Sequence, residues 1–319
     1  MSHSTAVSSC AFATPSITSP HVLTEIALKE CVGKRDLSEV FVVDCLHLCG
    51  SEQIVTVEWP QTHDFYTPTP QAHSPLLFTE SVRQALAVSC QTAHDIPRDY
   101  SLGWERLTLD VVADALRTTG SPTLVQLQVI HSAIKRRRMG SVQLVAHVQG
   151  TVNGVYAGSA EVHYSAYPSS IYNRLRGPYA DRAVFLRAAP PTPPLAPELV
   201  GRTNARDVVL SPTGEAGRWQ MRVDTSHTVL YDHPHDHIPG MVLLEAVSQA
   251  AQTSLDAPAT PVAFDTTFDG YVEFDAPCWL NATPLSPDLH GRPRVLIEAH
   301  QRERRVFSST VVLAPQGAR

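Results

Sequence analysis

The stretch DHPHDHIPGMVLLEAVSQAAQ, residues 232–252, reads as a turn that leads into one buried helix. A Pro-Gly pair marks the turn, and apolar side chains then occupy nearly every face of the following helical turns. A helix that is apolar on all sides is normally buried inside a protein. Two polar residues interrupt it, Glu245 and Gln249, and their four-residue spacing places them on one face. A buried carboxylate and a buried amide need either hydrogen-bond partners or a chemical function.

The same pattern occurs 165 residues earlier in the chain. The stretch HSPLLFTESVRQA, residues 73–85, contains Glu80 and Gln84 at the same four-residue step. Solenoid proteins repeat with much shorter periods, of roughly 20–50 residues. A repeat at about half the chain length therefore indicates a duplicated domain, and we expect two similar halves.

Length and composition are those of a globular protein with two domains. The chain has 319 residues, and its net charge of −6 argues against general nucleic-acid binding. The six cysteines are scattered, which indicates free thiols rather than a zinc site. Residues 1–20 lack the basic and apolar segments of a signal peptide, and no run of about 18 apolar residues suggests a membrane span. We expect a soluble, cytoplasmic protein.

The predicted elements follow the same order in both halves. Two strands at residues 39–48 and 53–59 precede a helix at 74–93, and strands with alternating apolar residues follow. This is the order of a hotdog fold, in which an antiparallel sheet wraps a long helix, so we predict an α+β tandem hotdog protein. The expected parts are a flexible tail at 1–30, a first hotdog domain at 31–186, a proline-rich linker at 187–199 and a second hotdog domain at 200–319.

The motif HPHDH at residues 233–237 suggests a metal site as one hypothesis. Histidines that alternate with an aspartate are good zinc ligands. The motif is one residue shorter than the HxHxDH spacing of metallo-hydrolases, and the first half keeps Glu80 and Gln84 without such a cluster. Because the halves share the helix and not the histidine cluster, we predict no metal in the site.

Each helical glutamate follows a histidine in the sequence, which favours acid/base chemistry. A single helical carboxylate is as readily explained by an ion pair with arginine, but the duplication weakens that interpretation. At the N-terminus of a buried helix, a histidine and a carboxylate provide an acid/base pair beside backbone N–H groups that polarise a carbonyl. This combination suits acyl chemistry.

The segment 233–250 resembles the HFPG…PGVLxLEAxAQ signature of hotdog hydroxyacyl-carrier-protein dehydratases. Their catalytic residues are a histidine and a glutamate, and the resemblance implies these roles for His233 and Glu245. The loop is shorter here than in the signature, so His235 and His237 remain alternatives for the catalytic histidine.

Motifs from both halves together resemble the AfsA (A-factor synthase) family of γ-butyrolactone and butenolide biosynthesis. The motifs are WPQTHDFYTP and ESVRQA in the first half and DHPHDHIPGMVLLEA in the second, and the resemblance covers roughly residues 30–315. It implies an acyltransferase that moves a β-ketoacyl group from an acyl carrier protein to a hydroxyl of dihydroxyacetone phosphate. The resulting ester closes to a phosphorylated butenolide, a precursor of a signalling molecule. The phosphopantetheine of the carrier is the only prosthetic group that the resemblance implies.

Such a reaction needs a base for the hydroxyl, donors for the thioester oxygen and a cation for the phosphate. The catalytic candidates are His63, Glu80, Gln84, His233, Glu245 and Gln249. The substrate-binding candidates are His73, Arg83, His237, Pro239 and Gly240. Ser248 takes the place of Arg83 in the second half, so the halves are chemically unequal. Because a pocket in paired hotdog units lies between them, we expect both halves to contribute.

A basic run, Lys135, Arg136, Arg137 and Arg138, falls between two predicted strands and so at a hairpin tip. It is either a solvated turn or a contact for an acidic carrier protein. One short basic tip in an acidic chain does not predict nucleic-acid binding.

Two other functions are compatible with the same residues. A dehydratase or a thioesterase would use the same histidine and glutamate on the same fold. A protein without catalytic activity could bind an acyl ligand or a lactone in the groove beside the helix.

Overall fold

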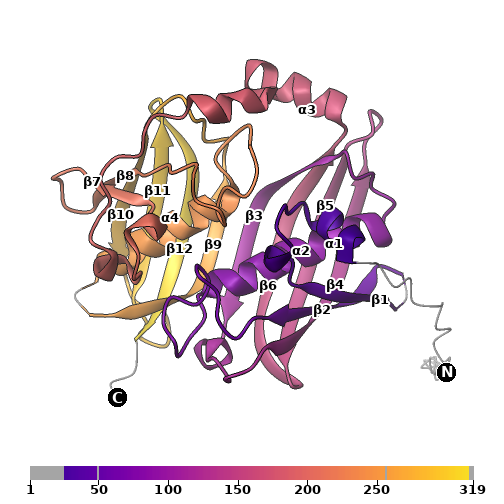
Figure 1. Ribbon diagram of the computed structural model, residues 1–319, viewed down its shortest axis with the longest axis horizontal. Coiled ribbons are helices and arrows are strands. Elements are labelled where there is room, and N and C mark those ends of the chain that lie inside the picture. Colours follow the sequence, from indigo (N-terminus) through magenta and orange to yellow (C-terminus); the bar gives the residue numbers. More distant parts are fainter. Residues whose placement is uncertain (1–24, 49, 256, 316–319) are drawn as a thin grey trace, which may run out of the picture.

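The computed structural model describes residues 25–48, 50–255 and 257–315 of the chain. Two similar α+β units lie side by side, and their strands form one 12-stranded antiparallel sheet in the order β1-β2-β4-β5-β6-β3-β9-β12-β11-β10-β8-β7 (Figure 1). Each unit curves its part of the sheet around one buried helix, α2 in the first unit and α4 in the second. The predicted tandem hotdog fold is confirmed.

The first unit contains α1 at Glu25–Val32, β1 at Val42–His47, β2 at Glu52–Trp59, α2 at Pro75–Thr92, β3 at Ser101–Val111, β4 at Thr123–Arg136, β5 at Val142–Val152 and β6 at Val155–Tyr167. Helix α1 lies partly inside the segment 1–30 that the sequence predicted as a tail. Leu28 and Val32 are buried and α1 packs against α2, so apolar burial makes this helix part of the folded unit. The rest of that segment, residues 1–24, lies outside the described residues.

Helix α2 is buried along most of its length, as its apolar sequence predicted. It begins with a Ser74 cap, whose hydroxyl accepts a hydrogen bond from the Leu76 N–H, and a proline occupies its first turn. Two glycines of the sheet make room for Phe78 on this helix. A Cβ atom at Gly150 would lie 2.5 Å from Phe78 Cε2, and one at Gly158 would lie 3.2 Å from Phe78 Cε1. The sheet can approach the helix this closely because these two positions carry no side chain.

The second unit repeats the order with a shorter first pair of strands. It contains β7 at Leu210–Pro212, β8 at Arg218–Met221, α4 at Gly240–Thr253, β9 at Ala259–Phe268, β10 at Cys278–Leu285, β11 at Arg294–Gln301 and β12 at Arg304–Pro315. Helix α4 is buried from Met241 to Ala251 and packs against β9, β10, β11 and β12.

The two units join where β3 pairs with β9, from Arg106 opposite Thr267 to Asp110 opposite Ala263. Helices α2 and α4 also contact each other across this seam. A bulge between Trp104 and Arg106 interrupts the pairing of β3 with β6 at the end of the seam. Bulges redirect side chains, and here the bulge occurs where the pairing of β3 with β9 begins, at Arg106.

The chain passes from the first unit to the second through α3 at Ser169–Arg176 and the short 3-10 turns at Gly177–Ala180 and Arg182–Arg187 (Figure 1). The sequence assigned residues up to 186 to the first domain. In the structure this crossover, residues 168–187, also packs on the second unit, because Arg176 binds Asp236 and Glu273. The proline-rich linker lies along the second unit as well, since the Leu195 N–H donates to the Leu210 carbonyl.

The basic run lies at the hairpin between β4 and β5, with Lys135 and Arg136 ending β4 and Arg137 and Arg138 in the turn. Cys31, Cys45, Cys90 and Cys278 are free thiols, while Cys10 and Cys49 lie outside the described residues. Among the described helices, none is long and apolar enough to cross a membrane.

Candidate active site

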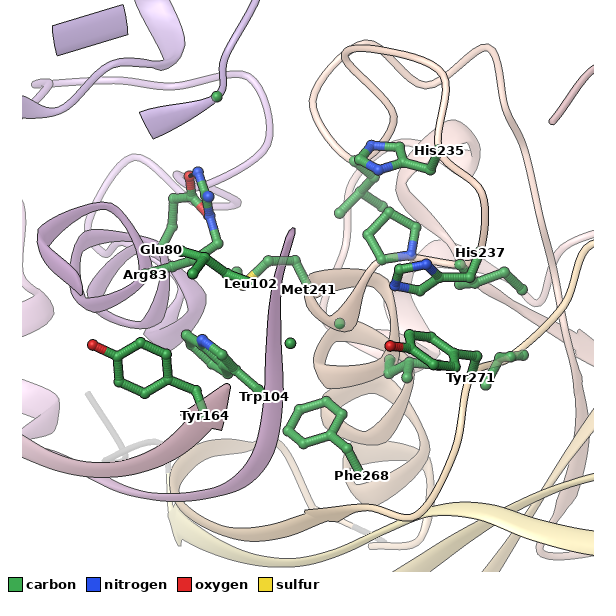
Figure 2. Close-up of a pocket in the computed structure, with 18 of the residues that line it drawn as sticks. Glu80, Arg83, Leu102, Trp104, Tyr164, His235, His237, Met241, Phe268 and Tyr271 are labelled. Atoms are coloured by element: carbon green, nitrogen blue, oxygen red, sulfur yellow. Dashed lines mark hydrogen bonds and ion pairs between the residues drawn. The ribbon is translucent and has the colours of Figure 1, made fainter. Parts of the chain in front are cut away.

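A cavity of about 400 Å³ lies between the two units, beside the middle of α2 and at the N-terminal end of α4 (Figure 2). The first unit contributes Lys34, Glu80 and Arg83 to its wall. The second unit contributes residues of the histidine loop, residues 232–238, and the first residues of α4. Figure 2 shows Glu80 and Arg83 on one side of the cavity and the histidine loop on the other. Both units therefore build the same cavity.

Glu80 is an ionised carboxylate that holds two cations at the cavity wall. The Arg83 guanidinium donates to both of its oxygens at 2.8 and 2.7 Å, and the Lys34 ammonium lies 3.3 Å from Oε1. Burial alone would raise the pKa of Glu80, but Arg83 and Lys34 outweigh burial and lower the pKa to about 2. A carboxylate held this way is a weak base at neutral pH, so Glu80 does not suit the role of a general base. Its contacts suit the role of holding Lys34 and Arg83 in position.

Gln84 and His63 fasten the loops of the first unit to α2. Gln84 accepts a hydrogen bond from the Phe41 N–H at 2.9 Å and donates to the Glu39 carbonyl and to Glu80 Oε1. His63 Nδ1 accepts from two backbone N–H groups, and Nε2 lies 3.1 Å from a Glu39 carboxylate oxygen. Both ring nitrogens thus have protein partners, and His63 lies outside the cavity wall.

The second unit repeats this arrangement residue by residue. Gln249 accepts from the Val209 N–H and donates to the Asp207 carbonyl, and His227 Nε2 lies 3.1 Å from Asp207. His227 Nδ1 accepts from the backbone N–H groups of Val229 and Leu230. In the same way, His63 Nδ1 accepts from those of Phe65 and Tyr66. The glutamines and these two histidines are therefore a framework common to both units.

Glu245 is the counterpart of Glu80, but it is sealed inside the protein. Arg202 donates to both carboxylate oxygens, at 2.7 and 2.5 Å, and also to the carbonyl of Phe65 in the first unit. The Phe65 ring lies against the guanidinium at 4.2 Å. Both charged side chains are almost fully buried. Glu245 therefore has no access to the cavity that Glu80 lines.

One pair of equivalent residues differs in size between the two units. Phe65 follows His63 by two residues, and Val229 follows His227 by two residues, with matching backbone hydrogen bonds to the histidine rings. The Phe65 ring is fully buried against Arg202. The smaller Val229 lines the cavity, as Glu80 does. The large side chain closes one position, and the small one keeps its equivalent open.

The histidine loop presents two histidines that are each paired with the preceding aspartate. His233 Nδ1 lies 2.5 Å from Asp232 Oδ1, and His237 Nδ1 lies 2.9 Å from Asp236 Oδ1. Each pair fixes the ring and leaves Nε2 as the second ring nitrogen. His235 differs, because its pKa is lowered to about 3. Burial is the main cause, and the charges of the neighbouring His233 and His237 add to it. His235 is therefore neutral near pH 7.

Possible metal-ligand atoms of Asp232, His233 and His235 lie within 4.8 Å of one another. This arrangement gives the metal hypothesis a geometric basis that the sequence spacing alone did not. Asp232 is already engaged, since it accepts from the Arg35 N–H and binds His233, and the positive charge of Lys34 acts on it as well. These contacts satisfy the carboxylate with protein groups and place a cation beside it, which opposes a metal ion.

Asp236 is fixed by a buried network that includes the crossover. Arg176 donates to Asp236 Oδ2 at 2.8 Å and to the Asp236 carbonyl, and it binds both oxygens of Glu273. The Tyr172 hydroxyl donates to the same Asp236 oxygen at 2.7 Å, and the guanidinium stacks on Tyr271 at 4.1 Å. His237 is thereby held through Asp236 by a segment that precedes the second unit.

The N-terminus of α4 and a group of aromatic residues complete the cavity. Pro239 precedes the helix, and no described side chain caps it. Because the first N–H groups of a helix lack intrahelical acceptors, those of Gly240 and Met241 can bind an oxygen atom in the cavity. Figure 2 shows Trp104, Tyr164 and Phe268 together below Glu80 and His235, and the rings of Trp104 and Phe268 form an edge contact at 6.3 Å.

Comparison with known protein families identifies the family of this chain and agrees with its fold. The family described as "AfsA: A-factor biosynthesis hotdog domain" matches residues 16–168 and again residues 186–313. This chain belongs to the AfsA family. The two matched segments correspond to the two units of the structure.

Curated AfsA relatives match nearly the whole chain. A "2-oxo-3-(phosphooxy)propyl 3-oxoalkanoate synthase" from Streptomyces virginiae is 33% identical over 291 residues, which cover 91% of this chain and 98% of that protein. A protein with the same description from Streptomyces griseus is 34% identical and covers 90% of this chain and 95% of its own length.

Solved structures with the same fold are distant in sequence. A putative oleoyl thioesterase from Lactobacillus plantarum superposes with a TM-score of 0.52 at 9% identity, covering 83% of this chain and 97% of that one. An acyl-ACP thioesterase from Bacteroides thetaiotaomicron gives 0.50 at 11% identity, covering 82% and 98%. At these identities the likeness concerns the fold alone.

The structure separates the AfsA-type candidate residues into two groups. The cavity is lined by Glu80, Arg83, His233, His237, Pro239 and Gly240. The other candidates are bound to hydrogen-bond partners within the units and are buried, except His63, whose side chain is 9% exposed: His63, His73, Gln84, Glu245 and Gln249. His73, for example, is buried with Nδ1 3.0 Å from the Thr67 hydroxyl, and burial followed by His63 lowers its pKa to about 4.

Several residues around the AfsA cavity had not been named as catalytic or substrate-binding candidates from the sequence: Lys34, Asp232, Asp236, Arg176 and Trp104. A signal for Lys34 was present. Gly33-Lys34 and Gly201-Arg202 are equivalent, since each glycine has a positive φ and each cation binds the helical glutamate of its own unit. Arg176 had no such signal, because the crossover has no counterpart in the repeat.

Proposed function

We propose that this chain transfers a 3-oxoacyl group from a thioester to the primary hydroxyl of dihydroxyacetone phosphate. Its Streptomyces relatives are named as synthases of the ester that this reaction forms. The observation that carries the proposal is the lining of the cavity between the units, which combines cations and histidines with a group of aromatic residues. Such a site suits a substrate with a phosphate at one end and an acyl chain at the other.

The phosphate is bound by Lys34 and Arg83 in this proposal. Arg83 presents a planar guanidinium that Glu80 holds in place, and its side chain is 29% exposed and so accessible from the cavity. Its Nε and Nη2 groups donate to Glu80, and Nη1 and Nη2 also donate to the Val32 carbonyl, so Arg83 would offer a phosphate its positive charge and the remaining Nη1 N–H. Lys34 lies at the same wall through its own contact with Glu80. The two cations would place the hydroxyl of the acceptor near the histidine loop.

The base is His233 in this proposal. Asp232 binds its Nδ1, which leaves Nε2 to accept the proton of the acceptor hydroxyl. Asp232 lies close enough to Lys34 for that charge to act on its pKa, so His233 is the histidine beside the cation wall. His237 and the first N–H groups of α4 are adjacent in sequence and would bind the thioester carbonyl oxygen, where negative charge develops.

Each bond change is then assigned to a group. His233 Nε2 takes the hydroxyl proton as the acceptor oxygen attacks the thioester carbon, and the oxyanion rests on the N–H groups of Gly240 and Met241. When the carbonyl re-forms, the carbon–sulfur bond breaks, and the proton passes from His233 to the leaving thiolate. The products are the phosphorylated 3-oxoacyl ester and the free thiol.

The donor in this proposal is an acyl carrier protein with its phosphopantetheine arm, and the protein acts in the cytoplasm. The aromatic residues Trp104, Tyr164 and Phe268 would receive the acyl chain. Tyr164 is held at the cavity wall by His131, whose Nε2 lies 2.6 Å from its hydroxyl. A fixed aromatic wall of this kind limits the length of chain that fits.

The test is incubation of the protein with a β-ketoacyl thioester and dihydroxyacetone phosphate, followed by mass spectrometry. We expect the phosphorylated ester or the butenolide phosphate that it forms on cyclisation. Release of free acid, or of an enoyl product, without acceptor would instead identify a thioesterase or a dehydratase. Binding of the thioester with no turnover by correctly folded protein would also overturn the proposal.

A further inference from the structure

Basic side chains without a carboxylate partner are concentrated on one part of the described surface. Among the described residues, no carboxylate forms an ion pair with Lys135, Arg136, Arg137, Arg138, Arg174, Arg182 or Arg187. The contacts that they do make are to neutral groups, such as the His94 carbonyl for Arg136 and the Met139 sulfur for Arg174. Most arginines elsewhere in the described residues are ion-paired, as Arg98 is with Glu30, and the exceptions Arg35, Arg294 and Arg304 are dispersed in the sequence.

These residues belong to two segments that touch each other. The β4–β5 hairpin meets the start of the crossover, since a Cβ atom at Gly140 would lie 3.2 Å from Pro168 Cγ. Arg174 of α3 also reaches the hairpin, with its guanidinium 3.8 Å from Met139 Sδ. The hairpin residues 135–139 and the crossover residues 174–187 therefore form one continuous surface, which we call the docking face.

The docking face reaches the candidate active site at its other end. Phe185 lies between Arg182 and Arg187, and its ring is 6.5 Å from that of His235, which lines the cavity. Arg176 of the same crossover binds Asp236 of the histidine loop. A molecule bound on the docking face would thus lie next to the histidine loop, where the side chain of His233 is 27% exposed.

Large apolar side chains are exposed among the cations. Met139 is 60% exposed, Leu175 is 59% exposed and Leu186 is 83% exposed. Exposed apolar residues among charged residues are typical of an interaction surface for a protein, and here Asp181 is the one carboxylate among the cations of the docking face. A nucleic acid would use the cations but would gain little from these aliphatic groups.

We propose that the docking face binds an acidic acyl carrier protein and directs its phosphopantetheine arm into the cavity. This inference rests on the proposed acyl transfer, because the transfer requires a thioester donor. The whole chain has a net charge of −6, but the unpaired cations make the docking face locally positive. A locally positive surface attracts an acidic partner. Leu175 and Leu186 would pack against apolar residues between the acidic groups of the carrier.

The decisive experiment compares two donors that carry the same β-ketoacyl group. One is the thioester on a phosphopantetheinylated acyl carrier protein, and the other is the N-acetylcysteamine thioester, which has no carrier. The variants reverse charge in pairs, Arg182→Glu with Arg187→Glu and Arg137→Glu with Arg138→Glu. Arg294→Glu is the matched control, because Arg294 also lacks a described carboxylate partner but lies on β11, outside the docking face.

We expect each double variant to raise KM for the carrier-bound donor by about tenfold or more, with a weaker dependence on salt. Turnover of the N-acetylcysteamine donor should stay within about twofold of wild type, and Arg294→Glu should change neither donor. Equal losses with both donors, or unchanged KM for the carrier-bound donor in both double variants, would overturn the docking face.

Binding of the carrier protein, measured by titration calorimetry, separates this inference from the proposed function. If wild type transfers no acyl group from either donor, the proposed function fails. Carrier binding that is lost in the double variants and kept in Arg294→Glu would still support the docking face. Binding of an RNA oligonucleotide in place of the carrier would overturn it.

Discussion

Arg176 and Asp236 are joined by a hydrogen bond of 2.8 Å that links the crossover to the histidine loop. The bond places a segment that is absent from the internal repeat beside one of the two aspartate–histidine pairs of the cavity. Arg176 also binds Glu273, so two buried carboxylates depend on one guanidinium. The crossover is therefore part of the structure that supports the site.

Replacement of Arg176 by methionine should be strongly destabilising. It would leave Asp236 and Glu273 buried without their cation, and removal of one partner from a buried ion pair typically costs about 3–5 kcal/mol. Urea denaturation followed by circular dichroism measures the change. Arg302→Met is the control, because Arg302 also pairs with an aspartate near the crossover, through Asp275, but is about half exposed. Exposed pairs contribute about 0–1 kcal/mol, so similar losses in the two variants would contradict the assigned role of Arg176.

Replacement of the two helical glutamates by glutamine should have different kinetic effects. Glu80→Gln removes the anchor of Lys34 and Arg83 at the cavity wall, so we expect kcat/KM for transfer to fall by about 10- to 100-fold, mostly through KM for dihydroxyacetone phosphate. Glu245→Gln leaves Arg202 buried without its carboxylate and should lower stability, while the folded fraction keeps a KM near wild type. The assays require a temperature at which circular dichroism shows both variants folded. A normal KM in Glu80→Gln would contradict the phosphate site.

Val229→Phe should close the cavity by giving it the residue found at the equivalent position, Phe65. The added ring would project into the cavity that Val229 lines. We expect transfer activity to fall by about 100-fold or more, which is a barrier increase of about 3 kcal/mol, with an unchanged circular dichroism spectrum. Val229→Ala serves as the control and should retain activity. Full activity in Val229→Phe would show that acyl transfer uses a different cavity.

Stability should fall at mildly acidic pH because of buried neutral histidines. The pKa of His131 is lowered from an ordinary value of 6.5 to about 3, mainly by burial and to a smaller extent by the charge of the nearby His94. Burial likewise lowers the pKa of His73 to about 4. The unfolded chain therefore binds more protons than the folded chain below pH 6.5. The contribution of these two histidines to the free energy of unfolding is fully present above pH 6.5 and is lost as the pH falls towards 4. Glu80, with its pKa near 2, adds a further loss only below its ordinary value of 4.5.

Urea midpoints measured from pH 7 to 4.5 test this dependence. His131→Leu should flatten the decline, although it also removes the hydrogen bond to Tyr164 and so lowers stability at neutral pH. A midpoint that is constant from pH 7 to 4.5 in wild type, or an equally steep decline in His131→Leu, would contradict the assignment to buried histidines.

The sequence alone predicted the architecture because the repeat carries strong local signals. The apolar helices with Glu80 and Gln84, or with Glu245 and Gln249, are both buried as expected, and alternating strands follow each of them. The predicted helix at 74–93 differs from α2 by one residue at each end. Burial patterns of this kind depend on neighbours in sequence, so they can be read from the chain.

The composition of the site was less predictable because it depends on contacts between distant residues. Glu245 is closed off by Phe65, and Arg202 also binds the Phe65 carbonyl 137 residues away. His63 was a candidate base, but its second ring nitrogen binds Glu39 and its first accepts backbone N–H groups. The equivalence of His63 with His227 could have been recognised in the sequence, since both lie shortly before a helix of the repeat. The covering of Glu245 by Phe65 could not have been recognised in this way. The sequence shows that Phe65 is large but does not show which distant residues its ring contacts.

The continuous pairing of β3 with β9 also bears on how such a protein can change over evolutionary time. In a homodimer one gene encodes both copies of every residue, so a substitution that blocks one symmetry-related site blocks the other as well. Here the two units are covalently joined in one sheet, and each position of the repeat can mutate independently. Phe65 and Val229 occupy equivalent positions with different side chains, and Arg176 belongs to a segment that a dimer would lack. Joining the two units in one chain thus lets equivalent positions differ, so that Glu80 lines the cavity while Glu245 is sealed by Arg202 and Phe65.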